Sequence, residues 1–128
     1  MKLLLDTHTF LWWITDDPRL SSRVQSLIAD KTNELWLSVA SAWEIAIKAQ
    51  LGRLRLPDDA PQFVITQLAL NAIQTLPIQR RHALHVYKLP LHHRDPFDRL
   101  LVAQSKIENL PLVTADAQIN EYAVDTVW

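Results

Sequence analysis

The sequence contains no cysteine and only one glycine, Gly52, among its 128 residues. The absence of cysteine excludes a disulfide framework and a zinc site built on thiolates. A phosphate-binding glycine loop or a dinucleotide fingerprint needs several closely spaced glycines, so a single glycine excludes both. No apolar run approaches the roughly 20 residues that a membrane-spanning helix requires, so we expect no membrane partner.

The N-terminal residues do not resemble an export signal. The apolar run Leu3-Leu4-Leu5 meets Asp6 too early for a secretory signal sequence. We therefore expect a cytoplasmic protein. With 128 residues, of which 48% are hydrophobic, the sequence predicts a single domain spanning residues 1–128 that buries one core without disulfides or structural metals.

The formal net charge of −1 argues against a protein that coats nucleic acid by charge alone. A net charge close to zero can hide a division of the surface into acidic and basic regions. If four acids formed one site, the other side chains would comprise 13 basic and 10 acidic groups, a charge of +3. An acidic pocket in a mildly basic surround suits a metal-dependent enzyme that acts on a phosphate polymer. The four acids in question are Asp6, Glu44, Asp98 and Asp116.

Short apolar runs alternate with segments of helical periodicity along the whole chain, which predicts an α/β sandwich with a mainly parallel sheet. We expect four to five strands, at residues 2–5, 34–38, 73–78, 112–114 and, marginally, 125–128. The main expected helices cover residues 10–14, 22–28, 39–54, 63–72, 80–87, 95–109 and 119–123. In the helix at 80–87, Ala83, Leu84 and Val86 are expected to face inward.

The four acids are predicted to meet at the carboxyl edge of this sheet, where parallel sheets bind ligands. Asp6 and Asp116 each follow an apolar run, and Glu44 lies near the start of the helix after the second strand. Asp98 lies in the first turn of the helix that leads back to the fourth strand. Right-handed crossovers place all these positions on the same side.

Carboxylates gathered in this way require protons or a cation. Two of them 4 Å apart repel by roughly 4 kcal/mol at an effective dielectric constant of 20. Oxygen ligands without cysteine suit Mg²⁺ or Mn²⁺. The hydroxyls of Thr7 and Thr114 are candidates for holding a carboxylate or a water molecule.

Each acid also has a structural interpretation, which the sequence leaves open. Asp6 and Asp116 could cap the helices that follow them. Asp98 could stabilise its own helix through a favourable interaction with the helix dipole. Ser41 and Glu44 fit a capping box, and Glu44 could pair with Lys48 one turn later. We interpret Asp95 as the N-cap of its helix. A second possibility is that Asp95 orients the metal ligands without binding the metal itself.

Histidines and arginines also lie close to Asp98 in the sequence. A zinc site of His92, His93 and His8 is disfavoured because adjacent histidines usually point apart. Arg94 and Arg99 flank the acids and are the best candidates for contacts with substrate phosphates, although Arg99 could equally be a surface residue.

Several ordered motifs make the sequence similar to the PIN-domain ribonucleases, and most of all to the VapC-type toxins of type II toxin–antitoxin pairs. The Asp-Pro-Phe-Asp-Arg block is the most specific of these motifs, whereas residues 57–90 contain no diagnostic motif. The resemblance is found in Asp6-Thr7-His8-x-x-Leu11-Trp12, Ser38-x-x-Ser41-x-Trp43-Glu44-Ile45-x-x-Lys48, His93-Arg94-Asp95-Pro96-Phe97-Asp98-Arg99-Leu100-Leu101-x-Ala103-Gln104 and Thr114-Ala115-Asp116.

The resemblance implies a three-layer α/β/α fold and endonucleolytic cleavage of RNA that depends on Mg²⁺ or Mn²⁺. It also implies a homodimer and inhibition by a cognate antitoxin protein. The residues that match the metal ligands of the family are Asp6, Glu44, Asp98 and Asp116, the last being the position that varies most in the family.

Two alternatives remain at the level of sequence. A PIN-like protein could act as a non-catalytic binding partner, although all four acids are present. A phosphoacceptor receiver domain also places an acidic Mg²⁺ pocket at a sheet edge, but it needs an acceptor aspartate after the third strand and a lysine after the last, and neither is evident.

Overall fold

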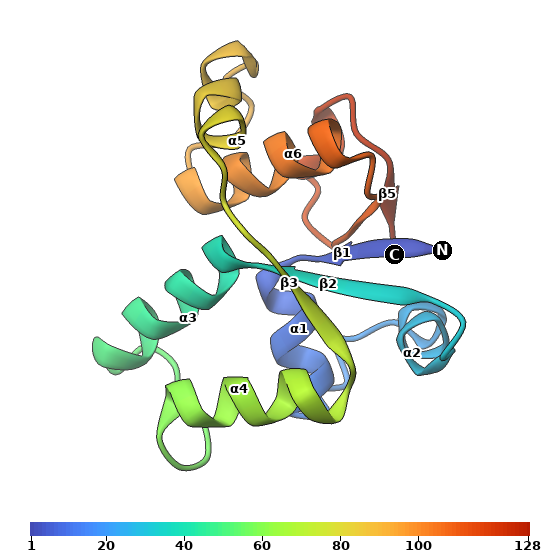
Figure 1. Ribbon diagram of the computed structural model, residues 1–128, viewed down its shortest axis with the longest axis vertical. Coiled ribbons are helices and arrows are strands. Elements are labelled where there is room, and N and C mark those ends of the chain that lie inside the picture. Colours follow the sequence, from blue (N-terminus) through green and yellow to red (C-terminus); the bar gives the residue numbers. More distant parts are fainter.

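The computed structural model describes residues 1–128 and contains one five-stranded sheet in which every pair of neighbouring strands is parallel (Figure 1). The strand order is β3-β2-β1-β4-β5. This confirms the predicted parallel sheet, with five strands. The strands are β1 (Lys2–Leu5), β2 (Glu34–Ser38), β3 (Ile73–Leu76), β4 (Leu112–Val113) and β5 (Thr126–Val127).

Helices cover both faces of the sheet, which gives the three-layer arrangement that the resemblance implied. In Figure 1, α5 and α6 lie above the sheet, while α1, α2 and α4 lie below it. α3 runs outward from the end of β2 and contacts both α4 and α6. The helices are α1 (Thr7–Ile14), α2 (Ser22–Ala29), α3 (Val39–Gln50), α4 (Ala60–Leu70), α5 (Arg80–His85) and α6 (Pro96–Glu108), with short 3-10 turns η1 (Val86–Lys88) and η2 (Ile119–Glu121).

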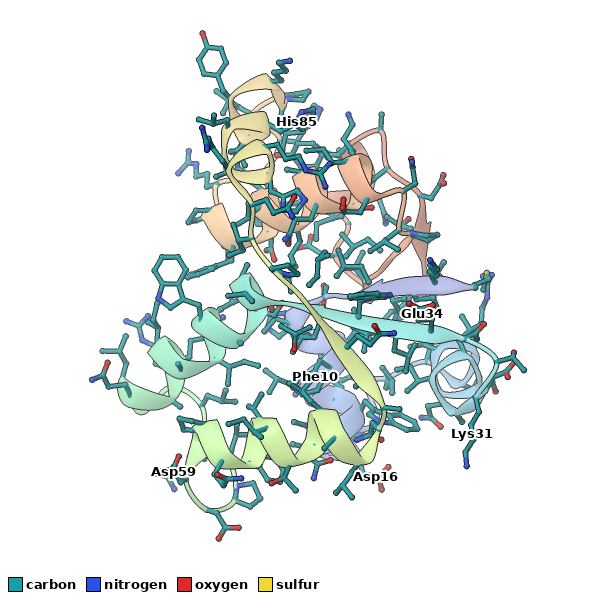
Figure 2. The ribbon with its side chains drawn as sticks, in the orientation of Figure 1. Phe10, Asp16, Lys31, Glu34, Asp59 and His85 are labelled. Atoms are coloured by element: carbon teal, nitrogen blue, oxygen red, sulfur yellow. The ribbon has the colours of Figure 1, made fainter.

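The central strand β1 divides the core into two halves. Successive side chains of a strand point to opposite faces. Leu3 and Leu5 therefore pack with Phe10 below the sheet, and Leu4 packs with Leu101 above it. Figure 2 shows Phe10 directed into the lower half of the molecule, whereas charged side chains such as Asp16 and Lys31 lie at the periphery.

Several predicted helix boundaries were wrong. α3 ends at Gln50 and not at Leu54, which agrees with the alternative that Gly52 ends this helix, since Gly52 adopts a φ of +74° that suits a helix exit. α4 begins at Ala60, capped by the side chain of Asp59, and not at Phe63 as predicted. No helix in the structure is long and apolar enough to cross a membrane.

The inward face of α5 was also predicted incorrectly. Leu84, expected in the core, is 66% exposed, while His82 is buried. The His82 ring accepts the backbone N–H of Gln79 through Nδ1 at 3.0 Å and lies 3.4 Å from the side-chain nitrogen of Gln104. Polar partners therefore stabilise the buried face of this helix.

Candidate active site

Asp6 follows β1 directly and is buried at the carboxyl edge of the sheet. One carboxylate oxygen accepts the backbone N–H of Thr9 at 2.9 Å, which caps α1. The other accepts the hydroxyl of Thr114, from the end of β4, at 2.5 Å. Burial raises the pKa of Asp6, and the hydrogen bond from Thr114 partly offsets this increase. The capping role and the predicted threonine contact are thus both confirmed, and both hold the carboxylate in place.

Glu44 is buried on α3 with one partner for each of its carboxylate oxygens. Thr7 donates its hydroxyl to Oε1 at 2.8 Å, as predicted. Lys48 donates from Nζ to Oε2 at 2.6 Å, so the expected pairing one turn along the helix is also confirmed. The capping box was wrong, because the side chain of Ser38 caps α3 and Ser41 lies inside the helix.

Asp98 lies in the first turn of α6, which is capped by the side chain of Asp95 as predicted. Burial is the main cause that raises the pKa of Asp98 from 3.8 to about 7. The negative charges of Asp95, Asp6 and Glu44 raise the pKa further, and the His93 ring lowers it. Acids at the start of α6, after β1 and on α3 therefore all raise the pKa of one carboxyl group. This agrees with the predicted convergence of the acids at one edge of the sheet.

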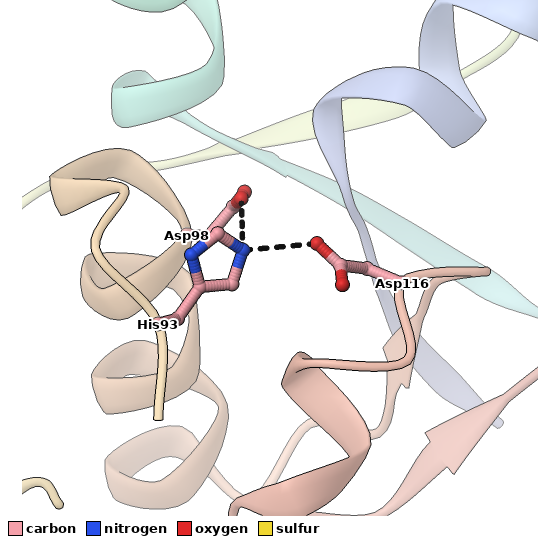
Figure 3. Close-up of side chains that lie close together, drawn as sticks. All are labelled: His93, Asp98 and Asp116. Carbon is pink, nitrogen blue, oxygen red and sulfur yellow. Dashed lines mark hydrogen bonds and ion pairs between the residues drawn. The ribbon is translucent and has the colours of Figure 1, made fainter. Parts of the chain in front are cut away.

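The carboxylates of Asp98 and Asp116 both approach the same nitrogen of the His93 ring (Figure 3). His93 Nε2 lies 3.0 Å from Asp116 Oδ2 and 3.1 Å from Asp98 Oδ2. The other oxygen of Asp116 accepts the backbone N–H of Gln118 at 2.8 Å. Asp116 does not cap the short 3-10 turn η2, because Gln118 is the N-cap residue there, so the capping alternative was wrong. His93 thus connects an acid on α6 with an acid that follows β4.

Arg99, a candidate for contacts with substrate phosphates, directs its guanidinium to groups of the protein itself. Its side chain is buried, and its guanidinium donates to the carbonyl of Pro90 at 2.8 Å, the carbonyl of Val86 at 3.0 Å and the hydroxyl of Tyr122 at 3.0 Å. The planar guanidinium therefore holds the segment between α5 and α6. Arg94 is exposed and stays a candidate for phosphate contacts.

The histidines behave differently from one another. The His8 ring packs against Trp12 at 5.8 Å between ring centroids, and the His92 ring packs against Tyr122 at 5.0 Å. Only His93 enters the acidic site, so the three histidines form no shared metal site. We had not assigned His93 a role. Its position two residues before the capping residue Asp95 was the available signal, because Nδ1 accepts the Asp95 backbone N–H at 3.1 Å.

Comparison with known proteins agrees with this geometry. The family model of the PIN domain matches residues 3–125. The chain belongs to the PIN domain family. Within this family it is similar to Ribonuclease VapC22 of Mycobacterium tuberculosis, with 29% identity over 98% of each chain. It is 32% identical to Ribonuclease VapC16 of the same organism, over 53% of this chain and about half (51%) of the length of that relative.

Solved structures confirm the PIN fold. The structure of VapBC2 from Rickettsia felis bound to a promoter DNA fragment aligns with a TM-score of 0.73 at 13% identity, over 100% of this chain and 98% of that chain. The structure of VapBC-1 from nontypeable Haemophilus influenzae aligns with a TM-score of 0.63 at 18% identity, over 94% and 91% of the two chains.

The side chains of this PIN domain fit a divalent cation. Their donor atoms are carboxylate oxygens, which Mg²⁺ and Mn²⁺ prefer. Burial raises the pKa of both Asp6 and Asp98, and at Asp98 the negative charges of Asp95, Asp6 and Glu44 raise it further. A cation would offset these negative charges.

Proposed function

We propose that this PIN domain is an endoribonuclease that depends on Mg²⁺ or Mn²⁺ and acts as the toxin of a toxin–antitoxin pair. The observation that supports it most is the convergence of the acids at one edge of the sheet. Ligand atoms of Asp98 and Asp116 lie within 4.8 Å of each other, and the charges of buried Asp6 and Glu44 help to raise the pKa of Asp98. The similarity to proteins named Ribonuclease VapC adds the substrate class.

In this proposal Asp6, Glu44, Asp98 and Asp116 hold the cation. When bound, such a cation lowers the pKa of a water molecule and offsets charge on a phosphodiester. Thr9 and Thr114 orient the Asp6 carboxylate, and Thr7 and Lys48 orient that of Glu44. Asp95 fixes the first turn of α6, which presents Asp98.

The proposed partners are an RNA substrate, a cognate antitoxin and a second copy of the chain. The aligned structures are described as VapBC assemblies, which supports the antitoxin. Exposed Arg94, four residues before Asp98, is the proposed contact with an RNA phosphate. The receiver-domain alternative has no support, because β3 ends at Leu76 and Pro77 follows it in place of an acceptor aspartate.

The proposal is tested by RNA cleavage with the purified protein, with Mg²⁺ or Mn²⁺ and with a chelator. We expect Asp98→Asn to lower the cleavage rate by more than about 100-fold, beyond the effect typical of residues that only support metal ligands. Asp125→Asn removes an exposed acid at the opposite edge of the sheet and serves as the matched control. Cleavage that persists in the chelator or in Asp98→Asn would contradict the proposal, and metal binding without cleavage would favour the non-catalytic alternative.

A further inference from the structure

Three side chains at the centre of the site have the spacing of a metal-binding group. Ligand atoms of His93, Asp98 and Asp116 all lie within 4.8 Å of one another. The simplest interpretation is that the His93 ring is a third ligand for the cation. The hydrogen bonds around the ring argue against this interpretation.

The other ring nitrogen of His93 determines where the ring carries its proton. Nδ1 accepts the backbone N–H of Asp95 at 3.1 Å, so its lone pair is already used and a proton there would collide with that donor. A neutral imidazole has one donor and one acceptor nitrogen, and Nε2 is therefore the N–H donor. A histidine that binds metal shows the reverse pattern, because its second nitrogen donates a proton to a carboxylate, a carbonyl or water.

The backbone of His93 is also held in place by hydrogen bonds. The N–H of His93 donates to the hydroxyl of Tyr122 at 3.0 Å, and the same hydroxyl accepts from Arg99 at 3.0 Å. Arg99 in turn holds the carbonyl of Pro90, three residues before His93. The side chain of His93 is only 11% exposed, so the ring has little freedom to turn.

We propose that His93 is a positioning residue whose Nε2–H donates to Asp116 and so holds that carboxylate beside Asp98, which lies 3.1 Å from the same nitrogen, and that His93 is not a ligand of the cation. This inference rests on the metal centre of the proposed function. Asp116 is fixed at both oxygens, by Gln118 on one side and His93 on the other. His93 thereby sets the spacing between an acid on α6 and an acid after β4 before the cation binds.

The first experiment measures binding of MnCl₂ alone by isothermal titration calorimetry, without RNA. We expect His93→Leu to weaken Mn²⁺ binding by about 10–100-fold, the range typical of residues that orient metal ligands. His93→Gln keeps an amide N–H at a similar reach, and we expect it to bind within about threefold of the original protein. His85→Leu, which replaces a histidine on α5 outside the acidic site, is the matched control and should leave the affinity unchanged.

The second experiment separates positioning from ligation. Pulsed electron paramagnetic resonance of the Mn²⁺-loaded protein should show no directly coordinated imidazole nitrogen. Nitrogen NMR of the metal-free protein should show the proton of the His93 ring on Nε2. A coordinated nitrogen that disappears in both His93 variants, or a proton on Nδ1, would overturn the inference.

The outcomes also separate this inference from the proposed function. If Mn²⁺ binds with the same affinity to His93→Leu and to the original protein, only the role of His93 is refuted. If the original protein binds no Mn²⁺, the metal centre and the role of His93 are both refuted. Thermal unfolding of each variant shows whether a weakened affinity comes with a folded protein.

Discussion

Asp98 is the residue at which the electrostatic cost of the site is concentrated. Burial and three neighbouring acids raise its pKa to about 7. A carboxyl group with a raised pKa holds its proton more tightly in the folded state than in the unfolded state. The stability that this group contributes is therefore present below its unfolded pKa of about 3.8 and is lost as the pH rises through the folded value of about 7.

The direction of this pKa shift predicts how pH affects the stability of the metal-free protein. We expect Asp98→Asn to increase the free energy of unfolding at pH 8 by on the order of 1–3 kcal/mol, because it removes the buried charge. The gain should shrink toward zero at pH 4, where the original carboxyl is protonated. Urea unfolding in the presence of a chelator measures both values. Asp125→Asn, at an exposed site, should change the stability by less than about 0.5 kcal/mol at either pH. A loss of stability at pH 8 would mean that Asp98 serves the helix and not a metal site.

The positions of the acids could be predicted at the residue scale, but the surroundings of other charged residues could not. Asp6 and Asp116 follow apolar runs, so their place at a sheet edge was visible in the sequence. Arg99 shares a motif with Asp98 and looks like a phosphate ligand, but the carbonyls that it contacts come from Val86 and Pro90, in a segment without a diagnostic motif. Charge can be read from a sequence, whereas burial of that charge depends on distant segments.

At the scale of elements, the guanidinium of Arg99 holds the segment between α5 and α6 against α6. Residues 89–95 contain no helix or strand and yet deliver His93 to the site. Arg99 donates to the carbonyls of Val86, Leu89 and Pro90 and to the Tyr122 hydroxyl. That hydroxyl in turn accepts from the His93 backbone. Geometry at the acids is therefore coupled to the packing of α6 against this segment.

This coupling predicts the effect of Arg99→Lys. A lysine ammonium cannot reproduce the planar fork of the guanidinium, so some of these carbonyls lose their donor. We expect a decrease of about 1.5–3 kcal/mol in the free energy of unfolding, the range for hydrogen bonds to charged groups. Hydrogen exchange of the amides in residues 86–94 should also become faster. Arg94→Lys, at an exposed neighbouring position, should change neither quantity, and an unchanged Arg99→Lys protein would refute the role of Arg99.

Buried polar contacts explain why some helix faces were predicted incorrectly. Gln104 is fully buried on α6, where it accepts the hydroxyl of Ser38 and donates to the carbonyl of Pro77 at 3.2 Å. It also lies beside His82, which takes the inward position on α5 in place of Leu84. Hydrophobic periodicity cannot reveal such contacts, because the partners are far apart in the sequence and polar.

At the scale of the whole molecule, the layer order and the parallel sheet followed from the alternation of strands and helices. The strand order places β1 between β2 and β4, so chain segments from both halves of the sequence meet beside Asp6. The boundaries of the short strands β4 and β5 were less predictable, because two-residue strands have little pattern of their own.

The assembled site predicts that a cation stabilises the whole fold. A ligand that binds only the folded state adds about 2.7 kcal/mol at 100 times its dissociation constant. We therefore expect Mn²⁺ to raise the melting temperature in a concentration-dependent way. The double variant Asp6→Asn, Asp98→Asn should lose this response. An equal shift in the double variant would place the bound cation elsewhere on the surface.

The hydrogen bond between Thr114 and Asp6 joins residues 108 positions apart. A ribosome adds roughly 5–20 residues per second. At the slow end of this range, Asp6 is therefore made many seconds before Thr114. Until β4 emerges and pairs with β1, a nascent chain lacks both Thr114 and Asp116. The four proposed metal ligands can therefore come together only after synthesis has passed Asp116.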